Sequence, residues 1–97
     1  MIKENNYEPV QAFELSQNYP NPFNPSTTIS YQLPVSIHVT IKVYDLLGRE
    51  VTTLVNEEKP FGTYKINFDA RSLASGIYYY RITAGDFSQT KKMILIK

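Results

Sequence analysis

The segment Ile37-His38-Val39-Thr40-Ile41-Lys42-Val43-Tyr44 alternates apolar and polar residues along its whole length. Successive side chains of a β-strand point to opposite faces of the sheet, so this period of two is typical of a strand with one buried face. The segment is therefore predicted to be a strand. Its inward side chains are predicted to be Ile37, Val39, Ile41 and Val43, and its outward ones His38, Thr40 and Lys42.

Six further segments are predicted to be strands because they are rich in β-branched and aromatic residues and lie between turn residues. They are residues 13–15, 28–33, 50–55, 62–69, 77–83 and 87–96. This regular spacing, with no helical period, predicts an all-β fold, an antiparallel β-sandwich of about seven strands. A small closed barrel is the alternative, since spacing alone does not separate the two. The long segments before residue 28 and after residue 69 favour Greek-key connections.

The connections are predicted from polar and turn-forming residues. Residues 45–49 are predicted to form a hairpin turn in which Gly48 adopts a positive φ at no steric cost. Residues 56–60 are predicted to be a polar loop, and residues 84–86 a turn. Residues 70–76 are predicted to be a loop with one helical turn at residues 71–73.

A proline-rich segment leads into the sandwich: Asn18-Tyr19-Pro20-Asn21-Pro22-Phe23-Asn24-Pro25-Ser26-Thr27-Thr28, called here the proline leader. Each proline fixes its own φ, lacks an N–H donor and pushes the preceding residue towards extended conformations. The proline leader is therefore predicted to be a rigid, extended loop. Tyr19 and Phe23 are predicted to close one end of the core, and an exposed binding site is the alternative. Residues 1–12 are predicted to be a linker or a disordered terminus, and residues 13–97 the domain.

Composition argues against several classes of protein. The 97 residues suffice for one domain, and the net charge of +1 gives no electrostatic case for binding nucleic acid or an anionic membrane. With no cysteine, disulfides, cysteine zinc sites and a cysteine nucleophile are excluded. His38 is the one histidine and lies on an outward face, so no credible catalytic triad exists. No loop clusters enough carboxylates for calcium. We therefore predict no catalysis, no metal and no cofactor.

Three consecutive tyrosines, Tyr78, Tyr79 and Tyr80, lie in the sixth predicted strand. Alternation places Tyr78 and Tyr80 on one face and Tyr79 on the other. One interpretation is a stacking platform for sugars that includes Tyr79, Tyr19 and Phe23. The interpretation we favour is core packing, with a tyrosine-corner hydroxyl bonded to the backbone of residues 74–76.

The last predicted strand ends in Thr90-Lys91-Lys92-Met93-Ile94-Leu95-Ile96-Lys97, an apolar run flanked by lysines. Lysines on an edge strand protect it from aggregation. A receptor could also recognise such a strand by strand addition and charge pairing, and two copies could pair through it as a homodimer. Met93 and Leu95 compete with Ile94 and Ile96 for the inner face.

Four strings of residues resemble one known family, the C-terminal sorting domains of the type IX (Por) secretion system, in particular its type A members. The first is Leu15-Ser16-Gln17 followed by the proline leader and Ile29. The others are Val43-Tyr44-Asp45-Leu46-Leu47-Gly48-Arg49-Glu50-Val51, Ser75-Gly76-Ile77-Tyr78-Tyr79-Tyr80-Arg81-Ile82 and Thr90-Lys91-Lys92-Met93-Ile94-Leu95. They occur in the family's order over residues 13–97. One departure is Phe68-Asp69-Ala70, where the family often has tryptophan, aspartate and glycine.

The resemblance implies an immunoglobulin-like sandwich without catalysis that directs a cargo protein, attached at its N-terminal side, across the outer membrane. The implied partners are the type IX translocon and a surface sortase-like peptidase, and the implied location is the cell surface or the medium. By motif match, the recognition or fold determinants are Gly48, Arg49, Gly76, Tyr78, Lys91 and Lys92. The leader residues that mark the family are Asn18, Tyr19, Pro20, Asn21, Pro22 and Phe23. The alternative function is an accessory carbohydrate-binding or structural module of a secreted hydrolase.

Overall fold

The computed structural model describes residues 12–97 of the chain. The linker predicted over residues 1–12 lies, except for Ala12, outside the described residues and stays a prediction.

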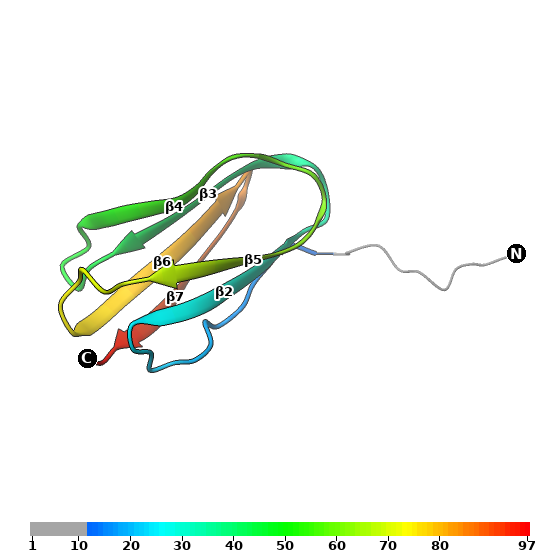
Figure 1. Ribbon diagram of the computed structural model, residues 1–97. Coiled ribbons are helices and arrows are strands. Elements are labelled where there is room, and N and C mark those ends of the chain that lie inside the picture. The colour runs from blue at the N-terminus through cyan, green and yellow to red at the C-terminus, as the bar shows by residue number, and fades with distance from the viewer. Residues whose placement is uncertain (1–11) are drawn as a thin grey trace, which may run out of the picture.

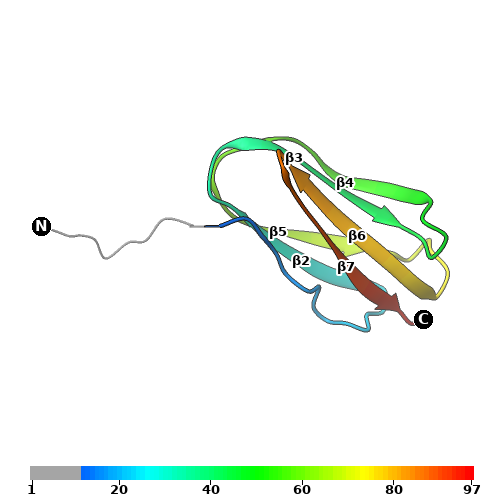
Figure 2. The ribbon, with the colours of Figure 1, turned by 180° about the vertical axis from the view of Figure 1, so that it is seen from behind.

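The described residues form two antiparallel sheets that pack face to face (Figures 1 and 2). The first sheet has the strand order β1-β2-β5, with β1 at Glu14–Leu15, β2 at Ser26–Leu33 and β5 at Gly62–Asp69. The second has the order β4-β3-β6-β7, with β3 at Ile37–Tyr44, β4 at Glu50–Lys59, β6 at Gly76–Ala84 and β7 at Phe87–Leu95. The chain changes sheet after β2, after β4 and after β5. The predicted sandwich with Greek-key connections is therefore confirmed, and the barrel is excluded.

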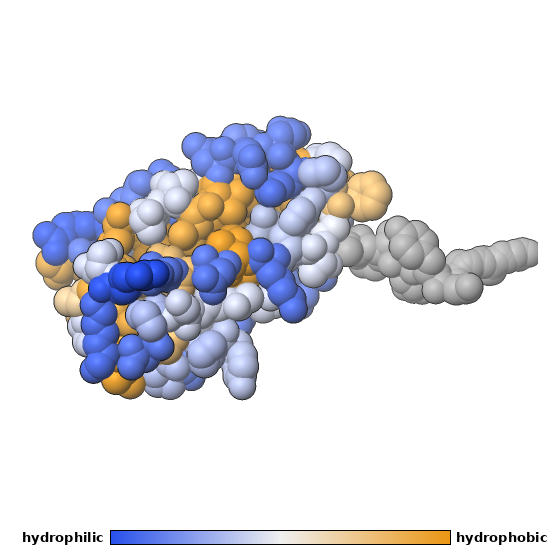
Figure 3. Space-filling model, in the orientation of Figure 1, coloured by the Kyte–Doolittle hydropathy of each residue, from blue (hydrophilic) through white to orange (hydrophobic). Residues whose placement is uncertain are grey.

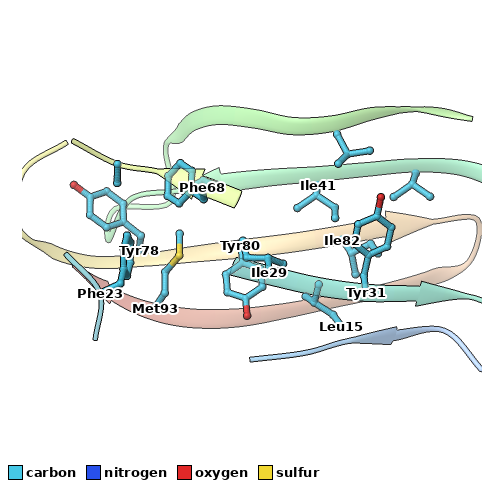
Figure 4. Close-up of a cluster of buried hydrophobic side chains, with 14 of the residues drawn as sticks. Leu15, Phe23, Ile29, Tyr31, Ile41, Phe68, Tyr78, Tyr80, Ile82 and Met93 are labelled. Atoms are coloured by element: carbon cyan, nitrogen blue, oxygen red, sulfur yellow. The ribbon is translucent and has the colours of Figure 1, made fainter. Parts of the chain in front are cut away.

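The core lies between the sheets and follows the predicted alternation (Figure 4). Ile29, Tyr31 and Leu33 of β2 face the second sheet, and none is more than 2% exposed. Three inward residues of β3 are fully buried, namely Val39, Ile41 and Val43, whereas Ile37 is only half-buried at the strand's start. Burying such a side chain contributes roughly 1.5–3 kcal/mol relative to leaving it in water. The alternation in the sequence thus identified the faces that hold the sheets together.

The structure also shows which apolar side chains of β7 face the core. Met93 and Leu95 are 0% and 1% exposed, whereas Ile94 is half-buried and Ile96 is 52% exposed. Register explains this, because Met93 lies opposite Tyr78 and Lys91 opposite Tyr80, and directly paired residues share a face.

Tyr78 and Tyr80 both belong to the core, and Tyr79 lies on the outer face, as predicted. The Tyr78 hydroxyl donates to the carbonyl oxygen of Ala74 at 2.7 Å, which is the predicted tyrosine corner. The Tyr80 hydroxyl donates to the carbonyl oxygen of Ser16 at 2.6 Å. Each buried phenol therefore has the partner that a buried polar group requires.

Four local predictions were wrong. Residues 56–59 are not a loop but the second half of β4, because β3 begins at Ile37 and pairs with β4 as far as Lys59. Residues 71–73 form a turn without a helix. The proline leader does not run extended, because Tyr19 and Thr28 exchange two backbone hydrogen bonds of 2.9 Å that close it into a loop. Phe23 is 2% exposed and closes the core as predicted, but Tyr19 is 81% exposed and does not.

The flank between β4 and β5 is open, because these strands belong to different sheets and do not pair. Half-buried apolar residues pack against the core along it, including Val51, Leu54 and Ile66. Figure 3 shows an apolar band in the same orientation, in the region between β4 and β5 of Figure 1. A pocket of about 240 Å³ lies at one end of this band, lined by Val51, Thr52, Phe68, Asp69, Ser72 and Leu73.

The buried Tyr80 predicts a loss of stability at alkaline pH. Burial raises the pKa of Tyr80 to about 12, whereas an unfolded tyrosine titrates near 10. The folded state therefore retains the phenol proton more tightly. The resulting contribution to stability is fully present below about pH 10 and is lost as the pH rises from about 10 to about 12. We expect the free energy of unfolding to fall by about 2–3 kcal/mol over this range, measured by urea denaturation.

The Tyr80→Phe variant is the control for this pH dependence. It loses the hydrogen bond to Ser16, so it should be less stable than the parent by about 1 kcal/mol near neutral pH. It has no phenol to titrate at this site, so its stability should fall less steeply above about pH 10. Equal slopes in the two proteins would contradict the assignment to Tyr80.

Candidate functional site

Two connecting segments and the C-terminal residues gather at one end of the sandwich (Figures 1 and 2). They are the β3–β4 turn at residues 45–49, the β5–β6 loop at residues 70–75 and the last residues 96–97. We call this the distal end, because the described chain enters the sandwich at the opposite end. The Lys97 backbone N–H donates to Ser75 Oγ at 3.0 Å, and the Lys97 ammonium donates to the Arg71 carbonyl oxygen, which ties the C-terminus to the β5–β6 loop.

The β3–β4 turn is held by one carboxylate. Asp45 Oδ1 accepts the backbone N–H groups of Leu47 and Arg49, each at 2.9 Å, and Asp45 Oδ2 accepts Arg49 Nε at 2.8 Å. The backbone N–H of Arg49 is the main cause that lowers the pKa of Asp45 below its ordinary value. Gly48 has φ +84°, a conformation that favours glycine. The turn thus presents Leu46 and Leu47, which are 62% and 76% exposed.

The proline leader is organised around two buried polar side chains, Asn18 and Thr27, which are 2% and 1% exposed. Asn18 Nδ2 donates to Thr27 Oγ1 at 3.0 Å and to the Pro20 carbonyl oxygen at 3.2 Å. Thr27 Oγ1 donates to the same carbonyl oxygen at 2.8 Å. Because unpaired buried polar groups are costly, this arrangement fixes the loop in one conformation.

The proline leader lies along β7, although about 70 residues separate them in sequence. Asn21 Oδ1 accepts the backbone N–H of Ile94 at 3.0 Å. Phe23 N donates to the Ile94 carbonyl oxygen and Ile96 N to the Phe23 carbonyl oxygen, both at 2.9 Å. Just before the leader, Gln17 Nε2 donates to the Lys92 carbonyl oxygen at 2.7 Å. Sequence patterns did not indicate Gln17 or Asn21 as contacts of the last strand, because no local signal encodes pairing at such separation.

The structure brings four of the six residues predicted as recognition or fold determinants to the distal end. Gly48 and Arg49 lie in the β3–β4 turn, and Gly76 and Tyr78 begin β6. The two lysines lie further along the sheet. Lys92 points outward opposite Tyr79 and is exposed, whereas Lys91 lies opposite Tyr80 on the other face and is half-buried.

A groove of about 310 Å³ lies on the outer face of the second sheet. It is lined by Tyr44, Gly48, Tyr79, Arg81 and Thr90. The sugar-stacking platform considered from the sequence does not form, since Phe23 is buried in the core and Tyr19 lies on the proline leader. The rings of Tyr79, Tyr19 and Phe23 therefore share no exposed surface.

Within residues 12–97, no three histidine, cysteine, aspartate or glutamate side chains gather closely enough to hold a metal ion. The same residues contain no helix that is both long and apolar enough to cross a membrane.

Residues 17–97 match the family described as the secretion system C-terminal sorting domain. The chain belongs to this family. The resemblance to the sorting-domain family inferred from the four motifs is thereby confirmed, and membership of type A stays a prediction. The sorting domain acts in protein secretion: it directs export through the outer membrane to the cell surface or the medium. A sorting signal is itself non-catalytic and interacts with secretion machinery.

Among the solved structures that resemble the sorting domain are two from one organism. Dimeric latent PorU from Porphyromonas gingivalis has a TM-score of 0.66 and 19% sequence identity, covering 96% of this chain and 10% of that chain. PorZ, described as an essential surface component of the type-IX secretion system of the same organism, has a TM-score of 0.58 and 21% identity, covering 88% and 11%. These likenesses support the fold, and the sorting domain spans about a tenth of either chain. Curated protein sequences give no match.

Proposed function

We propose that the type IX translocon recognises the sorting domain as a folded unit, at its distal end and along the adjoining outer face of β7. We propose also that a surface sortase-like peptidase later separates the domain from a cargo protein on its N-terminal side. The observation that carries the proposal is that the family's motif segments meet in space. Motif segments that are distant in sequence reach one end of the sandwich, through the β3–β4 turn, the start of β6 and the end of β7 beside the leader. The opposite end, where the described chain enters, leaves room for the cargo.

The contacts divide the motif residues into two proposed roles. Gly48, Arg49 and Tyr78 are fold determinants, because the turn needs a positive φ and both polar side chains donate a hydrogen bond within the domain. Lys92 is a recognition residue, because it is exposed and forms no ion pair with any residue in the described range 12–97. Its ammonium is therefore available to a carboxylate of the partner. Lys91 lies on the opposite face of the same edge strand and is half-buried, so we assign the recognition role to Lys92.

A reporter fusion tests the proposed function. Residues 13–97 are fused to the C-terminus of a periplasmic reporter in a host with a working type IX system. We expect the reporter to reach the cell surface or the medium, and a fusion lacking residues 90–97 to stay in the periplasm. Cell fractionation and surface protease accessibility measure the outcome. Periplasmic retention of both fusions would refute the proposal.

A point variant separates recognition from folding, since removing residues 90–97 also removes the buried Met93 and Leu95. Lys92→Glu reverses one exposed charge and leaves the core intact. We expect it to lower export several-fold with no loss of stability beyond about 0.5 kcal/mol. Lys65→Glu is the matched control, because Lys65 is an exposed lysine on β5 of the other sheet. Equal export of the two variants would argue against a role for Lys92.

A further inference from the structure

The edge of β7 that faces away from β6 is not free over its last residues. Four backbone groups on that edge are occupied, namely the Lys92 carbonyl, the Ile94 N–H and carbonyl, and the Ile96 N–H. Their partners are the side chains of Gln17 and Asn21 and the backbone of Phe23. Strand addition needs unpaired N–H and C=O groups along an edge, so a partner cannot add a strand here while these bonds exist.

The chemistry of the proline leader suits it to end a sheet. Asn21 provides its acceptor through a side chain, and the flanking Pro20 and Pro22 have no N–H with which to continue a ladder. Phe23 then forms an isolated parallel bridge with Leu95 of β7, while its ring is buried in the core. The leader therefore covers the edge of β7 without offering an equivalent edge of its own.

We propose that Gln17 and residues 18–23 form an intramolecular cap on the terminal strand, and that the machinery reads the closed, capped strand through its outward side chains. Recognition by strand addition along residues 92–96 is then excluded, and so is pairing of two copies through this stretch. Asn21 is a positioning residue of the cap, because its side chain accepts the Ile94 N–H. The second part of this proposal rests on the proposed function, whereas the cap itself can be tested without export.

Hydrogen exchange tests the cap in the purified domain. Asn21→Ala removes the acceptor of the Ile94 N–H, so we expect that amide to exchange about five- to tenfold faster. Asn21→Asp keeps an acceptor oxygen and should restore protection. Asn24→Ala is the matched control, because Asn24 is also exposed, also precedes a proline, and makes no side-chain hydrogen bond within residues 12–97. Unchanged exchange in Asn21→Ala would overturn the cap.

Export of the same variants tests what the machinery reads. We expect Asn21→Ala to lower surface delivery of the reporter several-fold, and Asn21→Asp and Asn24→Ala to match the parent. Normal export of Asn21→Ala with faster exchange at Ile94 would overturn recognition of the capped strand and leave the sorting function intact. Periplasmic retention of the parent fusion would refute the sorting proposal instead, and the exchange data would still decide on the cap.

Discussion

Replacing Tyr80 by alanine is expected to lower the free energy of unfolding by about 3–5 kcal/mol. Tyr80 is fully buried and is among the largest buried side chains of the core, between the sheets in Figure 4. The substitution leaves a cavity and removes the hydroxyl that donates to the Ser16 carbonyl oxygen at 2.6 Å. A small domain has a total stability of about 5–15 kcal/mol. Urea denaturation followed by circular dichroism measures the loss.

The neighbouring Tyr79→Ala variant is the control for this prediction. Tyr79 has the same side chain one residue earlier, but it is half-buried on the outer face. We expect it to cost less than half as much as Tyr80→Ala, because its removal opens no enclosed cavity. A larger loss for Tyr79 than for Tyr80 would show that the inner and outer faces of β6 are reversed.

The strands could be predicted from the sequence because their signal is local. In β3 every second residue faces the other sheet, so the alternation of Val39, Ile41 and Val43 with polar residues encodes both the strand and its buried face. Gly48 could be placed in a turn for a similar reason, since its positive φ is a property of one residue. The tyrosine corner was also local, because Tyr78 bonds to Ala74, four residues earlier.

The features that the sequence did not predict depend on distant partners. Residues 56–59 are polar, yet they continue β4 because the backbone of β3 lies beside them. The side chains of residues 56–58 are exposed and require no burial. Met93 and Leu95 could not be chosen over Ile94 and Ile96, since both pairs are apolar and only the register with β6 decides.

The largest difference concerns the proline leader and the terminal strand. They lie at opposite ends of the sequence, and the pattern of prolines predicted only stiffness. In the fold they form one unit, because Asn21 and Phe23 bond to β7 and Asn18 and Thr27 hold the loop that positions them. Two motifs that mark the family in sequence thus describe one structural element, which explains why they occur together.

This coupling predicts a large effect at Phe23. Its ring is 2% exposed and packs beside Phe68, with ring centroids 6.2 Å apart. Its backbone makes the two hydrogen bonds to Ile94 and Ile96. We expect Phe23→Ala to lower the free energy of unfolding by about 3 kcal/mol, because it opens a cavity and loosens the cap on β7. Urea denaturation measures the loss, and hydrogen exchange at Ile96 reports the loosened cap.

Tyr19→Ala provides the matched control within the same leader. Tyr19 is an aromatic residue beside Pro20, as Phe23 is beside Pro22, but it is 81% exposed. Its replacement should therefore lower the free energy of unfolding by no more than about 0.5 kcal/mol. If both variants lowered the free energy of unfolding by the same small amount, the Phe23 ring would not contribute to the core. A clear difference would mean that the leader is stabilised by one anchoring ring, and that the second ring is free to face a partner.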